Sequence, residues 1–389
     1  MPISRPRIIL LSPHDPNDIG TWSGTAYSAY HALLQSSAGV EVVRATWTDT
    51  LVRSIGRLLG KIGVRADYTR SVIYARLASM EASARLRFTQ GDVIVAIAAA
   101  PYFYSLNTSR PVIFVSDATF ASISSMYSSF AEMPQWLKND ADNIEYKALR
   151  RSDRILLSSE WAKASAVADY GAVPAAITVL PLGPNISTDL IDQYKPSKTA
   201  DFLGGVRLLF IGADWYRKGG PIVLEIKRHL DSLGIPCELF LVGNCPKDIP
   251  AENGITVLGR LDKSDDKQLR ELCRLYEHAH FFVLPTSAEA YGIVFSEAQA
   301  FGCPSLTYAV GGTPTAVLDG ITGYTLPLGS VAKDFAQMIC SLVRDPRQYE
   351  QMSANCRIRY ETDANWSSWA STVVNLASQL REQTQVSRA

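Results

Sequence analysis

The 389-residue sequence lacks a long apolar run, a net charge and closely spaced cysteines. No segment approaches the roughly 18 apolar residues that a membrane-spanning helix needs. Lys+Arg and Asp+Glu number 38 each, so the chain has no overall attraction for nucleic acid. The six cysteines show no C-x-x-C spacing, which favours reduced thiols over a disulfide framework. These features predict a soluble, cytoplasmic, globular protein.

Neither a signal peptide nor a dinucleotide fingerprint is expected from the first residues of the sequence. The apolar run RIILLSP near the N-terminus is short and is expected to form a first buried strand. The turn after it, SPHDPNDIGTWSGTAYSAYHALL, contains no G-x-G-x-x-G, and the next run, VEVVRATW, has no acid at its end for a ribose. A dinucleotide-binding dehydrogenase is therefore disfavoured.

What the sequence contains is an alternation of short apolar runs with longer helical patterns, which is typical of parallel sheets covered by helices. The first set of runs is RIILLSP, VEVVRA, DVIVAIAAA, RPVIFVSDA, RILLSS and ITVLPLG, and the second is VRLLFIGA, CELFLVG, ITVLGR, HFFVLPT and PSLTYA. The turn-rich stretch PNISTDLIDQYKPSKTADFLGG between them is expected to be a linker.

The sequence thus predicts an α/β protein with two Rossmann-like domains facing a central cleft, and its length suits two domains. We expect the domains to cover residues 1–190 and 205–364. Ligands of such sheets bind beyond the carboxyl ends of the strands.

The first turn carries Ser23, Gly24 and Thr25 directly before a helical pattern. Small residues there let a ligand approach the backbone, and the helix start offers unpaired N–H groups to an anion. A helix cap with a turn glycine explains the same residues equally well.

Two cations follow the first strand of the second domain. This strand, VRLLFIG, ends at Gly212, and the segment ADWYRKGGPIVLEI then places Arg217 and Lys218 near the next helix start. A cation there can face a diphosphate, whereas a structural cation would favour a helix C-terminus. A solvated pair is the alternative, which is credible for Arg217 and less so for Lys218.

The most informative stretch is PTSAEAYGIVFSEAQAFGCP, residues 285–304. Its strand end and helix start place Glu289 at the carboxyl edge of the sheet and Glu297 one to two turns into the helix. Backbone N–H groups of Tyr291, Gly292 and Ile293 can bind phosphate. Glu297 can accept hydrogen bonds from a ribose diol, and Glu289 can bind sugar hydroxyls or stabilise a positive sugar ring. The alternative is that Glu289 simply favours a helix start and that Glu297 is an exposed acid on the helix.

The run EAYGIVFSE resembles the glutamate, seven residues, glutamate pattern of GT-B retaining glycosyltransferases of family 4, the glycosyl transferases group 1. The segments FIGADWYRKGG, VLGRLDKSD, TYAVGGTP and DGITGY resemble that family in order and spacing, as do TWSG, SDATF and SSEWA less specifically. The resemblance implies transfer of a sugar from a UDP- or GDP-sugar to a hydroxyl of a glycan or lipid-linked acceptor, with retention of configuration.

The resemblance also implies roles for individual residues. Lys218 would contact the diphosphate, Glu289 the sugar and reaction centre, and Glu297 the ribose. Many members of the family have a histidine near the acceptor, whereas this chain departs from them with Asp117 in SDATF. Asp117 could orient the sugar or acceptor, and a buried acid capping a turn is an equal alternative. Neither a cofactor nor a metal is implied. The donor-binding set is Gly24, Gly212, Arg217, Lys218, Arg260, Leu261, Tyr291, Gly292, Ile293 and Glu297.

Some positions depart from the family pattern. Ala213 stands where an arginine usually follows the strand glycine, so Arg217 would have to replace it. This departure keeps a non-catalytic nucleotide-sugar-binding scaffold as an alternative. A sugar-nucleotide epimerase of the same architecture is a further, weaker one.

The segment 51–90 is basic. It carries Arg53, Arg57, Lys61, Arg65, Arg70, Arg76, Arg85 and Arg87 against Asp67 and Glu81. A helix would gather the first four cations along one side, beside the apolar residues Leu51, Ile55, Leu58, Leu59 and Ile62. Such a surface predicts peripheral contact with anionic lipid at the inner face of a membrane, or with an anionic acceptor. A solvated helix face is the alternative, because Gly56, Gly60 and Gly63 weaken a helix.

The last helical pattern, NWSSWASTVVNLASQLREQ, follows the second domain. By resemblance, this helix, residues 365–389, returns to pack on the first domain. From the sequence alone it could equally cap the second.

Overall fold

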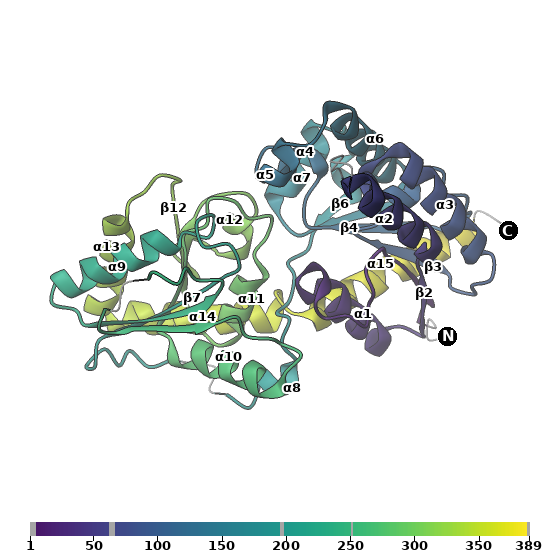
Figure 1. Ribbon diagram of the computed structural model, residues 1–389. Coiled ribbons are helices and arrows are strands. Elements are labelled where there is room, and N and C mark those ends of the chain that lie inside the picture. The colour runs from purple at the N-terminus through teal and green to yellow at the C-terminus, as the bar shows by residue number, and fades with distance from the viewer. Residues whose placement is uncertain (1–4, 62–66, 195–197, 250–251, 387–389) are drawn as a thin grey trace. The chain divides into compact units, whose positions relative to one another are not determined.

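The computed structural model describes residues 5–61, 67–194, 198–249 and 252–386. The chain divides into two compact units (Figure 1). The first comprises Met1–Pro181 together with Trp366–Ala389, and the second comprises Leu182–Asn365. Each unit holds one six-stranded sheet flanked by helices.

The first sheet has the strand order β2-β1-β3-β4-β5-β6, and every pair is parallel. Its strands are β1 (Ile8–Leu11), β2 (Val40–Val43), β3 (Val93–Ile97), β4 (Val112–Ser116), β5 (Arg154–Leu157) and β6 (Ile177–Val179). All four residues of β1 are fully buried, because helices cover both faces of a parallel sheet and leave no solvated side.

The helices of the first unit connect these strands. They are η1 (Thr21–Gly24), α1 (Thr25–Ser36), α2 (Thr46–Lys61), η2 (Tyr68–Arg70), α3 (Val72–Leu86), η3 (Ala100–Phe103), α4 (Phe120–Ser124), α5 (Ser128–Ala131), α6 (Gln135–Arg151), α7 (Glu160–Ala168) and η4 (Pro174–Ala176). The last helix, α15 (Trp366–Val386), packs on α1 and β3. It buries Trp369, Ala370, Val373, Ala377 and Leu380.

The second sheet is also parallel throughout, in the order β12-β11-β10-β7-β8-β9. Its strands are β7 (Val206–Gly212), β8 (Cys237–Gly243), β9 (Ile255–Gly259), β10 (Phe281–Leu284), β11 (Ser305–Tyr308) and β12 (Gly323–Leu326). Its helices are α8 (Thr188–Ile191), α9 (Gly220–Ser232), α10 (Asp266–His278), α11 (Ile293–Ala300), α12 (Thr313–Ala316), α13 (Ala332–Arg344) and α14 (Pro346–Thr362). The predicted fold class, α/β with two Rossmann-like sheets, is confirmed.

The stretch expected to be a linker belongs to the second unit. It contains α8, and its Lys198 ammonium donates hydrogen bonds to the carbonyls of Tyr276 (2.6 Å), Glu277 (3.1 Å) and Ala279. These are carbonyls at the end of α10, where a cation complements the helix dipole. Burial lowers the pKa of Lys198. The segment is therefore fastened to the unit that follows it.

Within the described parts of the chain, every helix is too short or too polar to cross a bilayer. The six cysteines, Cys237, Cys245, Cys273, Cys303, Cys340 and Cys356, are unpaired.

Candidate functional site

The carboxyl edge of the second sheet is built on two facing glycines. Gly212 ends β7 and Gly243 ends β8, directly opposite each other in the parallel register. Gly243 has a φ of +118°, and a Cβ atom there would lie 1.9 Å from the Gly212 carbonyl oxygen. A side chain at Gly243 would therefore push the two strand ends apart, whereas a Cβ atom at Gly212 would lie 2.8 Å from the Phe210 ring and 3.0 Å from Lys218 Cβ.

An ion pair between Lys218 and Glu289 stands at this edge. Lys218 precedes α9 and Glu289 follows β10, and the ammonium contacts Glu289 Oε2. Their side chains are only 13% and 12% exposed. The structure thus brings together the two residues predicted to contact the diphosphate and the sugar.

Glu297 lies in α11, and its side chain is 1% exposed. Its carboxylate is paired with the Lys263 ammonium through Oε1 and accepts a hydrogen bond from the Tyr276 hydroxyl at 3.0 Å through Oε2. The alternative of an exposed helix acid is therefore wrong, because burying a carboxylate requires charged or hydrogen-bonding partners.

The conformation of the loop before α11 depends on Gly292. Gly292 has a φ of +87°, and an added Cβ would lie 2.6 Å from the Phe295 ring and 3.1 Å from Glu289 Cγ. The tight turn therefore sets Glu289 beside the start of α11, where Ile293 is the first helical residue. Tyr291 turns inward, 2% exposed, with its hydroxyl 3.4 Å from the Leu182 carbonyl. Because the Tyr291 side chain is buried, a ligand at this edge could contact Tyr291 only through its backbone.

Arg217 contacts the loop that contains Glu289. Its guanidinium donates to the Ala288 carbonyl at 2.7 Å and lies 3.3 Å from the Asp214 carboxylate. These contacts hold the residue that precedes Glu289. Whether Arg217 replaces the family arginine missing at Ala213 stays a prediction.

Arg260 and Leu261 directly follow β9, whose last residue, Gly259, has a φ of +71°. Arg260 is exposed and Leu261 is half-buried. Their contact with a nucleobase stays a prediction.

Gly24 belongs to the first unit and lies in an unusual turn. Trp22, Ser23 and Gly24 have successive φ values of +45°, +56° and +84°. A non-glycine residue pays of order 1 kcal/mol or more for this left-handed region, and such strain concentrates at functional sites. Gly24 is buried and is the N-cap residue of α1. Its contact with phosphate stays a prediction.

Asp117 follows β4 in the first unit, where its carbonyl accepts a hydrogen bond from the Ser158 hydroxyl at 3.2 Å. Its carboxylate lies close enough to Glu145 of α6 to raise the pKa of that residue. Its role in orienting a sugar or acceptor stays a prediction.

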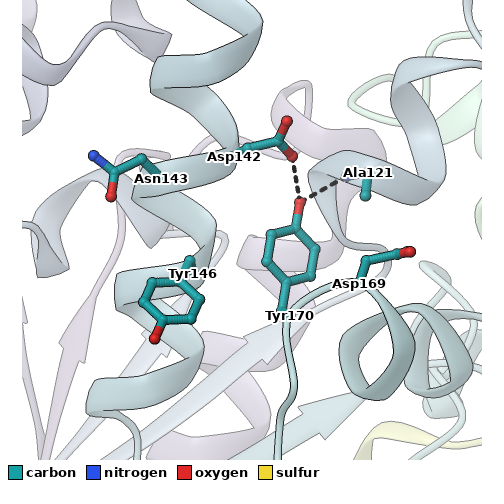
Figure 2. A pocket seen from close by; sticks show the side chains of 6 residues that line it. All are labelled: Ala121, Asp142, Asn143, Tyr146, Asp169 and Tyr170. Atoms are coloured by element: carbon teal, nitrogen blue, oxygen red, sulfur yellow. Dashed lines mark hydrogen bonds between the residues drawn. The ribbon is translucent and has the colours of Figure 1, made fainter.

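A surface hollow of about 440 Å³ lies elsewhere in the first unit (Figure 2). The Tyr170 hydroxyl donates to Asp142 at 2.8 Å and accepts from the Ala121 N–H at 2.9 Å. None of the site residues predicted from the sequence lines it.

Sequence reasoning missed Lys263 and Tyr276. Lys263 lies in the polar loop that follows β9, and Tyr276 sits among the core positions of α10. Nothing in a single sequence links either residue to Glu297. Among the described residues, no group of three or more His, Cys, Asp or Glu side chains is arranged to hold a metal ion.

Solved structures share this fold over almost the whole chain. Sucrose-phosphate synthase from Thermosynechococcus elongatus aligns with a TM-score of 0.70 and 17% identity, covering 97% of this chain and 100% of that one. Anabaena HepE in complex with UDP and glucose aligns with a TM-score of 0.60 and 16% identity, covering 96% and 100%. The chain has two Rossmann-like units and shares its fold with these neighbours, so its fold is of the GT-B class.

Residues 205–345 match the family model for glycosyl transferases group 1. The match lies within the second unit, and there it confirms the resemblance predicted from the sequence. Curated relatives include D-inositol 3-phosphate glycosyltransferases of Kribbella flavida and Thermobifida fusca. The first is 35% identical over 59% of this chain and 57% of its own length. The second is 28% identical over 59% and 55%. The chain thus spans somewhat over half the length of these relatives.

Proposed function

We propose that this protein is a retaining glycosyltransferase that moves a sugar from a nucleoside diphosphate sugar to an acceptor hydroxyl. The observation that carries the proposal is the pair of acids at one sheet edge, Glu289 and Glu297, each buried and each held by a lysine. A solvated or purely structural acid would not need this arrangement at the carboxyl edge of a parallel sheet, where such folds bind ligands.

In the proposed reaction, the bond between the anomeric carbon and the diphosphate oxygen breaks, and a bond to the acceptor oxygen forms on the same face. Lys218 and the backbone N–H groups near Gly292 stabilise the negative charge of the departing diphosphate. Glu289 stabilises the positive charge of the sugar ring. The acceptor's proton passes to the departing phosphate oxygen. The positive field comes from the protein, so the proposal includes no metal or cofactor.

The names of relatives and neighbours narrow the substrates. A UDP-sugar donor is supported by HepE, which was solved with UDP and glucose. A small hydroxylated acceptor is supported by the D-inositol 3-phosphate glycosyltransferases. The proposal therefore keeps two classes of acceptor: a small hydroxylated molecule, and the glycan or lipid-linked acceptor expected from the sequence.

The test is thermal stabilisation of the purified protein by UDP-, GDP- and ADP-sugars. A ligand that binds only the folded state raises the unfolding midpoint according to its affinity and concentration. We expect one class of donor to raise the midpoint of the wild type and to lose this effect in Glu297→Ala.

An exposed acid on α9 provides the matched control, because Glu225→Ala should keep the full shift. If no donor shifts the wild type, the glycosyltransferase proposal is overturned. If donors bind and incubation with acceptors yields no product, the non-catalytic nucleotide-sugar-binding scaffold is the correct function.

The proposal extends to peripheral contact with anionic lipid through the first unit. The helix predicted in the basic segment forms as α2, despite Gly56 and Gly60. It leaves Leu51, Ile55 and Leu58 exposed by 53%, 45% and 63%. Apolar side chains beside cations suit an interfacial helix. Ile62, Gly63 and Arg65 lie outside the described residues, and so does the side chain of Leu59.

Two cations of the segment are already engaged. Arg70 lies 3.3 Å from the Asp67 carboxylate and stacks on the Phe130 ring at 4.5 Å. Arg85 pairs with Glu81 at 2.8 Å. The proposed lipid contact is therefore concentrated on α2.

A further inference from the structure

Both carboxylate oxygens of Glu297 are occupied in the structure. Oε1 contacts the Lys263 ammonium, and Oε2 accepts a hydrogen bond from the Tyr276 hydroxyl. The proposed function requires the same carboxylate to accept hydrogen bonds from a ribose. Either the two protein partners share the carboxylate with the ribose, or one of them leaves.

Tyr276 is the fixed partner. It is fully buried in α10, and its ring stacks on Phe301 with centroids 5.5 Å apart and planes 11° apart. Burial, followed by the nearby Glu297 carboxylate, raises the pKa of Tyr276 well above its ordinary value. The phenol therefore stays protonated and can only donate to Glu297.

Lys263 is the exchangeable partner. It lies in the loop between β9 and α10, and 24% of its side chain is exposed. Its flexible stem lets the ammonium move into water and recover hydration there. Of the two groups that contact Glu297, only Lys263 comes from the solvent side.

We infer that Lys263 is a latch on Glu297 that the ribose of the nucleotide displaces, while Tyr276 stays bound and orients the carboxylate. The inference rests on the proposed function and adds a regulatory contact to its donor site. In the empty protein the ammonium compensates a carboxylate that would otherwise be buried alone. In the complex the 2′- and 3′-hydroxyls take its place, each donating one hydrogen bond to the carboxylate.

A latch has a measurable cost. Only the unlatched fraction of the protein can bind ribose, so the apparent dissociation constant exceeds the intrinsic one by the inverse of that fraction. Removing the latch should therefore tighten nucleotide binding, although it removes a positive charge close to an anionic ligand. Simple electrostatics predicts the opposite sign.

The experiment is calorimetric titration of wild type and Lys263→Met with UDP, GDP and ADP, and with the 2′,3′-dideoxy form of whichever binds. We expect the variant to bind the ribonucleotide about three- to tenfold more tightly. No gain is expected for the dideoxy nucleotide, which has no hydroxyls to replace the ammonium. Lys267→Met, an exposed cation at the start of α10, controls for the lost charge and should not tighten binding.

Equal or weaker ribonucleotide binding by Lys263→Met overturns the latch and leaves the proposed function standing. An equal gain for the dideoxy nucleotide also overturns it. If the wild type binds none of the three nucleotides, the proposed function fails, and the latch fails with it. If Lys263→Met does not fold, Lys263→Gln replaces it, because the amide keeps a hydrogen bond to Glu297 without the charge.

Tyr276→Phe tests the positioning role separately. It should weaken ribonucleotide binding and leave dideoxynucleotide binding unchanged. An equal loss for both nucleotides would show that the hydroxyl only supports the fold.

Discussion

Glu289 and Glu297 lie eight positions apart, on a loop and on the helix that follows it, and their lysines come from two other segments of the chain. Removing one member of a buried ion pair leaves the other uncompensated, which commonly costs 3–5 kcal/mol. Each ion pair can therefore separate without this cost only if a bound ligand provides a new partner for the group that loses its own. A charged, hydroxyl-rich ligand such as a nucleotide sugar can do so at both sites.

The first residue-scale prediction concerns Glu289. Glu289→Gln keeps the size of the side chain and removes its charge, so stabilisation of the sugar ring is lost while donor binding remains. We expect turnover to fall by about 100-fold or more, the usual scale for one transition-state electrostatic contact. Steady-state kinetics and donor titration of the same preparation measure the two effects.

Glu225→Gln, on the exposed face of α9, serves as the control and should keep wild-type turnover. A covalent glycosyl-enzyme trapped on Glu289 of the wild type would contradict transfer of the acceptor's proton to the departing phosphate in a single step. A loss of donor affinity with turnover unchanged would assign Glu289 to binding alone.

The second residue-scale prediction concerns pH and Glu145 of α6. This side chain is buried, and within the described part of the chain its Oε1 has no hydrogen-bond partner. Burial raises the pKa of Glu145 from its ordinary value of 4.5 to about 8; the Arg70 charge opposes this shift, and repulsion from Asp142 and Asp117 adds to it. The folded protein therefore holds a proton that the unfolded chain releases between about pH 4.5 and pH 8.

Because the folded state binds more protons in that interval, this group's contribution to stability is complete at low pH and is lost as pH rises towards 8. Glu145→Gln should raise the unfolding midpoint at pH 8 and change it little at pH 5. Thermal denaturation at the two pH values measures this, with the exposed Glu132→Gln as control. A benefit independent of pH would show that Glu145 is already ionised when folded.

At the scale of single elements, α2 exposes large apolar side chains that the packing of the first unit does not explain. One side carries cations, yet Trp47, Leu51 and Leu58 are 78%, 53% and 63% exposed. A helix that only faced water would not gain from these side chains. An interfacial helix would bury them among lipid headgroups.

We therefore predict that the protein co-sediments with anionic vesicles at low salt, and not with neutral ones. Each cation near an anionic surface contributes about 1 kcal/mol, so Arg57→Glu with Lys61→Glu should reduce binding by more than about tenfold. High salt should weaken binding by screening.

The matched control reverses two exposed cations of the second unit, Lys333→Glu with Arg344→Glu, and should keep vesicle binding. Equal binding to neutral and anionic vesicles would rule out the electrostatic attraction. No binding to either would make α2 the solvated helix face that the sequence also allowed.

The elements show what a single sequence can predict. The apolar runs predicted eleven of the strands because buried parallel strands are continuous in hydrophobicity. The last strand, β12, was missed, since GYTL contains only Tyr324 and Leu326 as large apolar residues and does not stand out as an apolar run. The two glutamates were predicted from a local motif. Lys263 and Tyr276 were not, because their contact with Glu297 joins segments 34 and 21 residues apart.

On the scale of the whole molecule, the chain leaves the first unit at Pro181 and returns to it at Trp366. The returning helix, α15, packs on α1 and β3 through side chains such as Trp369 and Val373, which are 1% and 0% exposed. Arg381 also lies 3.7 Å from the Asp92 carboxylate. The first unit therefore depends on a segment that follows the second unit in the sequence, whereas the second unit is continuous.

This connectivity predicts selective destabilisation by Val373→Asp. A carboxylate placed there would be buried without a partner, which should cost the first unit several kcal/mol. Scanning calorimetry combined with limited proteolysis should show the first unit unfolding at a lower temperature. The fragment that survives longest should correspond to residues 182–365.

The matched control is Asn375→Asp, which adds the same charge on the exposed side of α15 and should leave both units unchanged. If Val373→Asp instead exposed sites throughout 182–365 at the same temperature, the two units would unfold as one cooperative body. In that case α15 would stabilise the whole chain, and the second unit would need the first in order to stay folded. The donor site would then depend on a helix that contributes no residue to it.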